Sequence, residues 1–325
     1  MKEILLVGVD VSKITLDIFI KPSGTSMIIS NDLKGFKQWW VEMRTLLKPQ
    51  TKVMVVMEHT GLYSLQLENF LGKSGVDYCK IPALEIKRSL GMTRGKNDKI
   101  DAERIATYGW LRRDVLVADP IMEPSIDELK HLLNLRLKLV RDRAGYINRI
   151  KEMKATGNLV GLEQQQRVIA FFSQEIQMAD EGITAHIAKH PELQKTYDLL
   201  RSIKGIGPVI AAYMTGNTGN FKRFANARKF NCYAGIAPFN YQSGTSIKGR
   251  SRVSHLANKD AKTLLNLAAT CAIRCDEELK IYYQRKLSEG KNKMSCINAV
   301  RAKLVARMFA VIKRQSPYQP LAVAA

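Results

Sequence analysis

Four acidic residues in the first third of the sequence have the chemistry that metal-dependent cleavage of a phosphodiester requires. Asp10 follows the apolar run Leu5–Val9, and Glu58 closes a second apolar run. Asp98 and Asp101 are three residues apart, so a helix would present both on one face of its first turn. Carboxylates at the start of a helix also favour its positive end, so simple capping is an alternative role for this pair.

Four carboxylates that gather at one place repel one another unless a cation lies between them. Mg²⁺ and Mn²⁺ are ions that suit such hard oxygen ligands. Two such ions can activate the attacking group and stabilise the leaving oxygen of a phosphodiester. The sequence therefore predicts a Mg²⁺ site, with Mn²⁺ as a substitute, that is formed by Asp10, Glu58, Asp98 and Asp101.

The elements that must position these acids alternate between strands and helices, which is typical of a mixed sheet with helices packed on it. Hydrophobic periodicity and turn residues predict a strand hairpin over 5–20, strands over 25–30, 52–57 and 76–81, and helices over 33–47, 61–72 and from 97 onward. If the first and fourth strands are neighbours, Asp10 and Glu58 converge. A helix laid across that edge would add the aspartate pair.

Beyond Pro120 the pattern becomes helical. Apolar residues step by three or four over 126–147 and again over 169–187, with a break at Gly157 and Gly161. Two such helices predict an antiparallel coiled-coil hairpin, whose apolar stripes would serve packing or oligomerisation. We therefore expect a first domain over 1–118, a coiled-coil region over 119–191 and a C-terminal domain over 192–325.

The basic and glycine-rich segments are candidates for phosphate binding. Gly205-Ile206-Gly207 lies between two helical segments and resembles a helix-hairpin-helix turn, in which backbone N–H groups hold a phosphate; a plain Gly-Pro turn is the alternative. Residues 239–260 are polar and are expected to form a loop. The candidate nucleic-acid contacts are Arg94, Lys96, Lys204, Gly205, Gly207, Lys248, Arg250 and Arg252, against the alternative of solvated basic loops.

The composition points to a polyanionic partner. The chain has 51 Lys and Arg against 30 Asp and Glu, a formal net charge of +21, which favours nucleic acid over an unspecific basic surface. Five cysteines at loose spacing, without a zinc pattern, indicate reduced and mostly buried thiols in a cytosolic protein. We expect neither a signal peptide nor a membrane span, because no apolar stretch is long enough.

Six short segments, taken in order, resemble the insertion-sequence-110 family of transposases. In the first domain they are 8–13 (GVDVSK), 58–63 (EHTGLY) and 96–102 (KNDKIDA). In the C-terminal domain they are 203–208 (IKGIGP), 233–238 (YAGIAP) and 242–244 (QSG). The resemblance covers nearly the whole chain, and the ordered set is specific although each motif is short.

The resemblance implies a RuvC-like, RNase H-type α/β domain, an antiparallel coiled-coil insertion and a mainly α-helical transposase domain with a helix-hairpin-helix-like element. It implies a site-specific DNA recombinase guided by a bridge RNA that pairs donor and target DNA. In such a protein Asp10, Glu58, Asp98 and Asp101 hold Mg²⁺, and Ser243 forms a covalent phosphoserine link to DNA. The family's active site is composite, so dimers and tetramers are expected.

Two positions depart from the family pattern, because Asn97 stands where Thr is common and Thr245 where a second Gly is common. Asn97 can still cap a helix, whereas Thr245 weakens the assignment of the serine. The rival nucleophiles nearby are Tyr241, Ser246, Ser251 and Ser254. Two other functions stay open: a metal-dependent junction or structure-specific nuclease without a covalent intermediate, and a non-catalytic nucleic-acid-binding protein.

Overall fold

The computed structural model describes residues 4–48, 50–59, 61–89, 98–120, 123–243, 247–253 and 256–320. Within these ranges the side chains of 46, 98, 240–243, 247–248 and 250–252 are not described. The chain forms two compact units, Met1–Ile121 and Met122–Ala325. The domain boundaries expected at 118/119 and 191/192 stay predictions.

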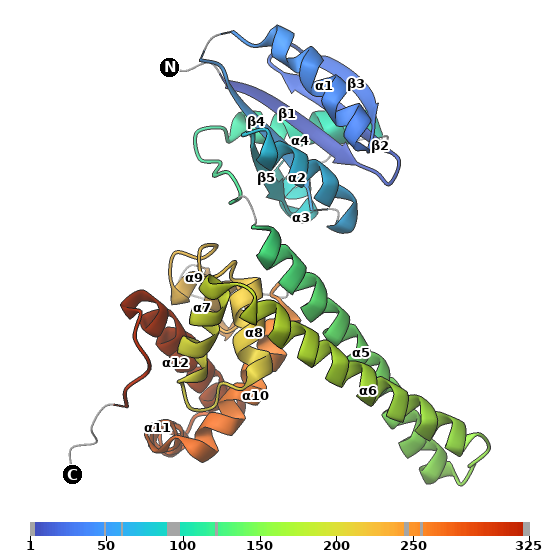
Figure 1. The fold of residues 1–325 in the computed structure, drawn as a ribbon. Coiled ribbons are helices and arrows are strands. Elements are labelled where there is room, and N and C mark those ends of the chain that lie inside the picture. The colour runs from blue at the N-terminus through green and yellow to red at the C-terminus, as the bar shows by residue number, and fades with distance from the viewer. Residues whose placement is uncertain are drawn as a thin grey trace. The chain divides into compact units, whose positions relative to one another are not determined.

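The first unit is built on a five-stranded sheet with the order β3-β2-β1-β4-β5 (Figure 1). Its strands are β1 (Ile4–Val11), β2 (Thr15–Lys21), β3 (Thr25–Ser30), β4 (Lys52–Glu58) and β5 (Asp77–Ile81). β2 pairs antiparallel with both β1 and β3, whereas β4 runs parallel to β1 and β5 runs parallel to β4. The first and fourth strands are therefore neighbours, which is the arrangement that convergence of Asp10 and Glu58 requires.

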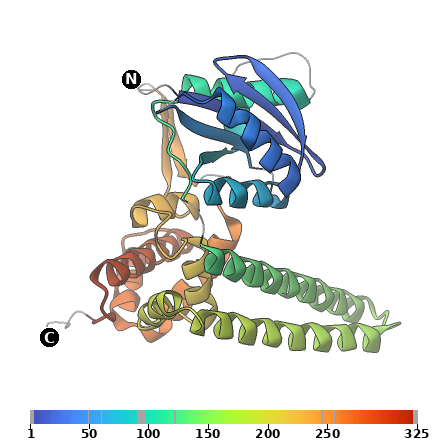
Figure 2. The ribbon, with the colours of Figure 1, turned by 45° about the horizontal axis from the view of Figure 1, so that its top comes forward.

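Helices cover both faces of this sheet (Figures 1 and 2). The helical segments are α1 (Leu33–Leu46), the 3-10 turn η1 (Gly61–Ser64), α2 (Leu65–Lys73), α3 (Ala83–Ser89) and α4 (Asp98–Leu111). Alternate strand residues supply two separate cores. Val7 and Val9 pack with Trp39 of α1 on one face, whereas Leu6 packs with Ile105 of α4 on the other.

The second unit begins with two long helices, α5 (Pro124–Thr156) and α6 (Leu162–Ala188), which lie side by side and are joined by a short turn (Figures 1 and 2). Gly157 and Gly161 have φ angles of 73° and 80° in that turn, a conformation that glycine adopts without strain. Burial is concentrated where the pair meets the rest of the unit, at Ile126–Leu133 of α5 and Ile176–Ile187 of α6.

The helical body of the second unit contains α7 (Pro191–Arg201), α8 (Pro208–Asn217), α9 (Ala227–Tyr233), α10 (Lys259–Cys275), α11 (Glu277–Ser288) and α12 (Lys293–Arg314). The helical stretch from residue 259 to residue 288 is not continuous. The structure interrupts it at Asp276, whose side chain accepts a hydrogen bond from the Leu279 N–H at 3.1 Å and so caps α11.

Residues 239–260 were expected to form a loop, and this expectation was wrong. They contain an antiparallel hairpin of β6 (Phe239–Ser243) and β7 (Ile247–Arg252). Phe239, Tyr241 and Ile247 favour strands, but the many polar neighbours hide that preference. A register shift between Phe239 and Tyr241 also breaks the simple alternation by which strands are recognised.

All five cysteines are free, but the expectation that most are buried was only partly right. Cys79 and Cys296 are buried, whereas Cys271 and Cys275 are exposed. The two exposed thiols are four residues apart on α10, so they share one helix face, and that face is turned to solvent.

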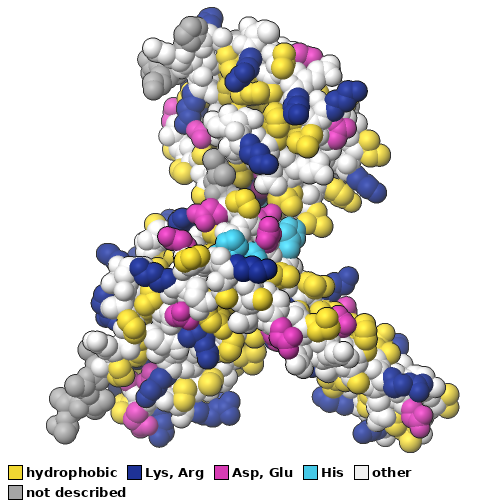
Figure 3. Space-filling view, in the orientation of Figure 1, with side chains coloured by type: hydrophobic (Ala, Val, Ile, Leu, Met, Phe, Trp, Pro, Cys, Tyr) yellow, Lys and Arg dark blue, Asp and Glu magenta, His cyan; other side chains and the backbone are white. Residues whose placement is uncertain are grey.

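The surface of both units carries basic side chains. In the view of Figure 3, Lys and Arg are spread over the two units with Asp and Glu between them, without one dominant basic patch on this face. Among the described helices, none combines the length and the apolar character that crossing a membrane requires.

Candidate active site

Asp10 and Glu58 lie at the carboxyl ends of two neighbouring parallel strands. The β1–β4 register ends with Val9 opposite Met57, so Asp10 and Glu58 follow side by side. Leu6 has the same phase as Asp10 in the alternation along β1, and it packs in the core beneath α4. The same alternation on β4 puts Glu58 on that face, so both carboxylates belong to the α4 side of the sheet.

Helix α4 crosses this face in the direction opposite to β1. A Cβ atom built on Gly8 would lie 2.3 Å from the backbone N of Ala106 and 2.5 Å from the backbone O of Ala102. A Cβ atom built on Gly109 would lie 2.8 Å from a methyl group of Leu6. Later residues of α4 therefore contact earlier residues of β1, and the helix can approach closely only because glycines stand at these contacts.

The first turn of α4 consequently lies toward the strand end that carries Asp10. Asp101 is half-buried there, and its carboxylate accepts a hydrogen bond from Arg104 Nη1 at 2.9 Å. Asp98 begins α4, but its side chain lies outside the described part of the structure. Asp10 and Glu58 each have an interaction partner.

The backbone thus brings all four predicted metal ligands to one end of the sheet. Among the described side chains, no group of three or more His, Cys, Asp or Glu residues is close enough to hold a metal ion, and the Asp98 side chain is not part of that set. The assignment of the four acids as ligands therefore stays a prediction, and the placement of their strands and helix supports it.

A fifth carboxylate, which the sequence pattern did not single out, lies at this place. Asp17 of β2 is directly opposite Asp10 in the β1–β2 register and is 8% exposed. It has the same phase as Phe19, which packs in the core beneath α4, so it lies on the face of the other acids. The available signal in the sequence was a single carboxylate inside the apolar run Leu16–Ile20. Asp17 is thus a further carboxylate beside Asp10, and it has an interaction partner of its own.

Ser243 lies at the tip of the hairpin in the second unit. The β6–β7 register reaches Ser243 opposite Ile247, and residues 244–246 between them are outside the described residues. The acids and this serine thus belong to different units. The following predicted side chains or residues also lie outside the described part: Tyr241, Ser243, Ser246, Ser251, Ser254, Arg94, Lys96, Lys248, Arg250 and Arg252.

Lys204, Gly205 and Gly207 form the turn between α7 and α8, as a helix-hairpin-helix element requires. Gly205 has a φ of 90°, and a Cβ atom there would lie 2.6 Å from Cβ of Ala272 in α10. Gly207 precedes Pro208 and is the N-cap of α8. Backbone conformation and packing are enough to require glycine at 205, so phosphate binding by this turn stays a prediction.

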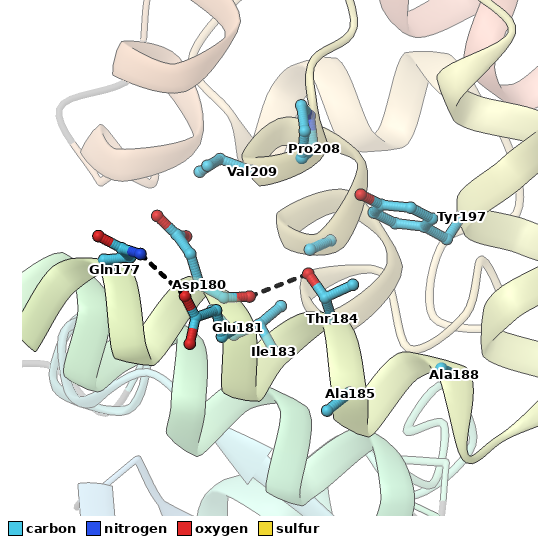
Figure 4. A pocket seen from close by; sticks show the side chains of 11 residues that line it. Gln177, Asp180, Glu181, Ile183, Thr184, Ala185, Ala188, Tyr197, Pro208 and Val209 are labelled. Atoms are coloured by element: carbon cyan, nitrogen blue, oxygen red, sulfur yellow. Dashed lines mark hydrogen bonds between the residues drawn. The ribbon is translucent and has the colours of Figure 1, made fainter.

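A cavity of about 650 Å³ borders the start of α8 but does not suit a phosphate (Figure 4). Its wall is largely apolar and carries the carboxylates of Asp180 and Glu181. Gln177 Nε2 donates to Glu181 at 3.0 Å, and Thr184 Oγ1 donates to the backbone O of Asp180 at 2.9 Å. Asp180 is paired with Arg136, whereas Glu181 has no ion pair among the described residues. The residues that line this cavity include no Lys or Arg that could bind a polyanion, so it is not a candidate nucleic-acid site.

Two models of protein families match the chain. Residues 7–153 match a DEDD transposase model of the IS110 group, which is described as "Transposase". Residues 197–284 match the model described as "Transposase IS116/IS110/IS902 family". The first match includes the strand ends and α4, and the second includes the helix-hairpin-helix turn and the β6–β7 hairpin.

Curated relatives extend the similarity over most of the sequence. The chain is 25% identical over 318 residues to the pilin gene-inverting protein of Moraxella bovis, with 96% of this chain and 97% of that protein covered. It is 22% identical over 332 residues to the putative transposase y4rJ of Sinorhizobium fredii, with 87% and 83% covered. It is 27% identical over 137 residues to the uncharacterized 43.6 kDa protein of insertion element IS110 from Streptomyces coelicolor, with 42% and 33% covered.

Proposed function

The chain belongs to the IS116/IS110/IS902 family of transposases and is a DNA transposase or recombinase, and from this premise we propose that it is a site-specific recombinase guided by a bridge RNA. The guide would pair with donor and target DNA, so that the protein contacts mainly backbone and shape. The net charge of +21 supports such contacts with polyanions. The relative named for inverting a pilin gene supports strand exchange over cleavage alone.

The fold that we propose for the first unit is RNase H-like, of the RuvC type. The strand order, with three antiparallel strands followed by two parallel ones, and the DEDD family match support it. We propose that α5 and α6 form an antiparallel coiled coil that assembles protomers into dimers and tetramers. Beyond the buried segments near the helical body, α5 and α6 still carry apolar residues such as Phe171, which is 57% exposed, and these are available for an assembly contact.

A DEDD transposase domain implies dependence on a divalent metal. We assign Mg²⁺, with Mn²⁺ as a substitute, to a site formed by Asp10, Glu58, Asp98 and Asp101. Carboxylates from two adjacent strand ends and from the first turn of α4 make an all-oxygen donor set, which suits these hard ions. When bound, the metal supplies charge stabilisation for the attacking and leaving oxygens of the phosphodiester.

Ser243 is the proposed nucleophile. Its Oγ attacks the phosphorus of a DNA phosphodiester, and a new bond between phosphorus and Oγ forms while the bond to one deoxyribose oxygen breaks. The released hydroxyl end takes up the proton that the serine loses. Because the serine ester keeps the energy of the phosphodiester, the reverse reaction can reseal a strand without ATP. The position of Ser243 at a hairpin tip supports this role, because a tip can approach a DNA backbone.

The observation that carries the proposal is the ordered match of both family models, which together include the acids and Ser243. The sharpest test is Ser243→Ala, which should abolish the covalent protein–DNA product on a denaturing gel while binding of DNA and guide RNA persists. Ser246→Ala and Ser251→Ala are matched controls and should retain the product.

Two outcomes would contradict this proposal and point to the alternatives. Hydrolysed DNA ends without any covalent product, unaffected by Ser243→Ala, would indicate a metal-dependent nuclease. Nucleic-acid binding without cleavage in either Mg²⁺ or Mn²⁺, by the assembled protein with its guide RNA, would indicate a non-catalytic binding protein.

A further inference from the structure

A cavity of about 840 Å³ lies in the second unit at the foot of the hairpin that carries Ser243. Pro238, which immediately precedes β6, and Val253, which immediately follows β7, both line this cavity. Lys262 of α10 and Arg301 of α12 also line it. The base of the hairpin and two cationic side chains therefore border the same space.

Arg301 is buried in the wall of this cavity, and no described residue offers it a counter-charge. The residue is 3% exposed. Its Nη1 donates to Oδ1 of Asn298 at 3.2 Å, its Nη2 donates to Oδ1 of Asn266, and its Nε has no partner. A guanidinium has five N–H donors, so more than half of them are unused within the described residues. Both of the acceptors that it does have are neutral amide oxygens.

Another arginine on the same helix shows how the unfavourable burial of a positive charge is usually offset by carboxylates. Arg307 lies on α12 as well, and its Nη1 and Nη2 lie 2.7 Å from Asp276 and 2.6 Å from Glu278. Burial of a charge is unfavourable unless an opposite charge offsets it, and burial accordingly lowers the pKa of Arg301. Arg301 has no carboxylate of this kind among the described residues, and the cavity beside it has room for an anion.

The other polar groups of the wall also suit an anionic oxygen ligand. Lys262 is partly buried, and the described residues give it no ion pair. Asn231 lines the cavity, and its Oδ1 is buried without a partner. An exchange of the amide O and N of Asn231 would present a donor there instead. The charged side chains of this wall are therefore positive, whereas those of the cavity in Figure 4 are negative.

We propose that this cavity receives one backbone phosphate of a DNA strand, with Arg301 and Lys262 as its cationic contacts, and so holds the strand beside the Ser243 hairpin. A guanidinium presents paired N–H groups that match two phosphate oxygens, which favours arginine for this purpose. The choice of DNA as the ligand rests on the proposed function. The existence of an anion site rests on the burial and the partners of Arg301 and on the cavity that Lys262 and Asn231 also line.

The test measures DNA affinity, independently of whether Ser243 forms a covalent product. Binding of a fluorescein-labelled DNA duplex, and of an RNA strand of the same length, is measured over a series of KCl concentrations. Arg301→Met should weaken DNA binding about tenfold or more and reduce the slope of log affinity against log salt by about one. Lys262→Gln should act in the same direction without altering the core, and Arg301→Lys should restore part of the affinity.

Arg314→Gln is the matched control, because it removes the same charge from the exposed end of the same helix and should leave affinity and slope nearly unchanged. A purely structural Arg301 would instead lower the melting temperature of Arg301→Met while the folded fraction binds DNA as before, which overturns the proposal. Loss of RNA binding alone also overturns it. A wild-type chain that binds no DNA would overturn both this site and the proposed function.

Discussion

At the scale of single residues, Asp10 has other carboxylates as neighbours in the sheet. Asp17 lies opposite Asp10 in the pairing of β1 with β2. Glu58 lies beside Asp10 at the end of β4, one residue beyond the last pair of the β1–β4 register. Carboxylates on one partly buried sheet face are unfavourable to desolvate and repel one another, so their persistence requires compensation. The DEDD family match implies dependence on a divalent metal, and this sheet edge is the site that we propose for it.

Asp10→Asn and Glu58→Gln keep the size of each side chain but remove its charge. Each variant should lower DNA cleavage by about a hundredfold or more, because a bound metal contributes several kcal/mol to stabilising the transition state. Titration calorimetry with Mn²⁺ should show weaker metal binding in the same variants. Asp77→Asn is the control in the same sheet. Asp77 is partly exposed and is paired with Lys52 at 2.8 Å, and loss of its charge should leave cleavage intact. Unchanged metal affinity in both acid variants would remove these residues from the site.

At the scale of elements, the packing of α4 on β1 decides where the aspartate pair lies. Gly8 and Gly109 allow the helix backbone to approach the sheet more closely than a side chain would permit. Because α4 runs opposite to β1, its first turn is carried to the end of the strand that bears Asp10. A small change in this contact would therefore move two predicted ligands at once.

Gly8→Ala should destabilise the first unit and impair cleavage together. Its Cβ would lie within 2.7 Å of three backbone atoms of α4, so the helix must shift away from the sheet, which costs about 1–3 kcal/mol or more. Chemical denaturation measures the change in the free energy of unfolding. Gly145→Ala on the exposed face of α5 is the matched control, since nothing lies within 4 Å of its Cβ, and it should stabilise by about 0.5–1 kcal/mol. A neutral Gly8→Ala would contradict the close packing of α4.

At the scale of the whole molecule, the predicted acids and the predicted nucleophile are on separate compact units. The acids belong to Met1–Ile121, and Ser243 belongs to Met122–Ala325. An arrangement of this kind allows an active site to be completed either within one chain or between protomers. The resemblance to the transposase family favours the second arrangement, in which different protomers of a tetramer supply the two parts.

Mixing two inactive variants distinguishes these arrangements. Asp10→Asn and Ser243→Ala should each fail to form the covalent DNA product alone. When their protomers assemble at random in equal amounts, about a quarter of the sites would combine intact acids from one chain with an intact serine from another. Recovery of product to roughly that fraction on a denaturing gel is therefore expected. If every site were built within one chain, the mixture would stay inactive, because each chain lacks one part.

The sequence by itself determined the local elements and the chemistry they carry. Continuous apolar runs, bounded by turn residues, located β1 and β4 and placed Asp10 and Glu58 at or near their ends. Helical periodicity located α5 and α6, because a helix gathers apolar residues that recur every three or four positions onto one face, whereas a strand does not. The order of the six short motifs indicated the transposase family, and the matches to two family models then confirmed it.

The tertiary structure alone decided which of these residues meet. Strand pairing brought Asp17 opposite Asp10, and a register is set by contacts between segments, which no single segment contains. The β6–β7 hairpin formed in a polar stretch, because pairing between strands outweighed the weak local preference. The burial of Arg301 also could not be predicted from its helix, which carries several basic residues. Its burial depends on the packing of other helices against α12, α10 among them.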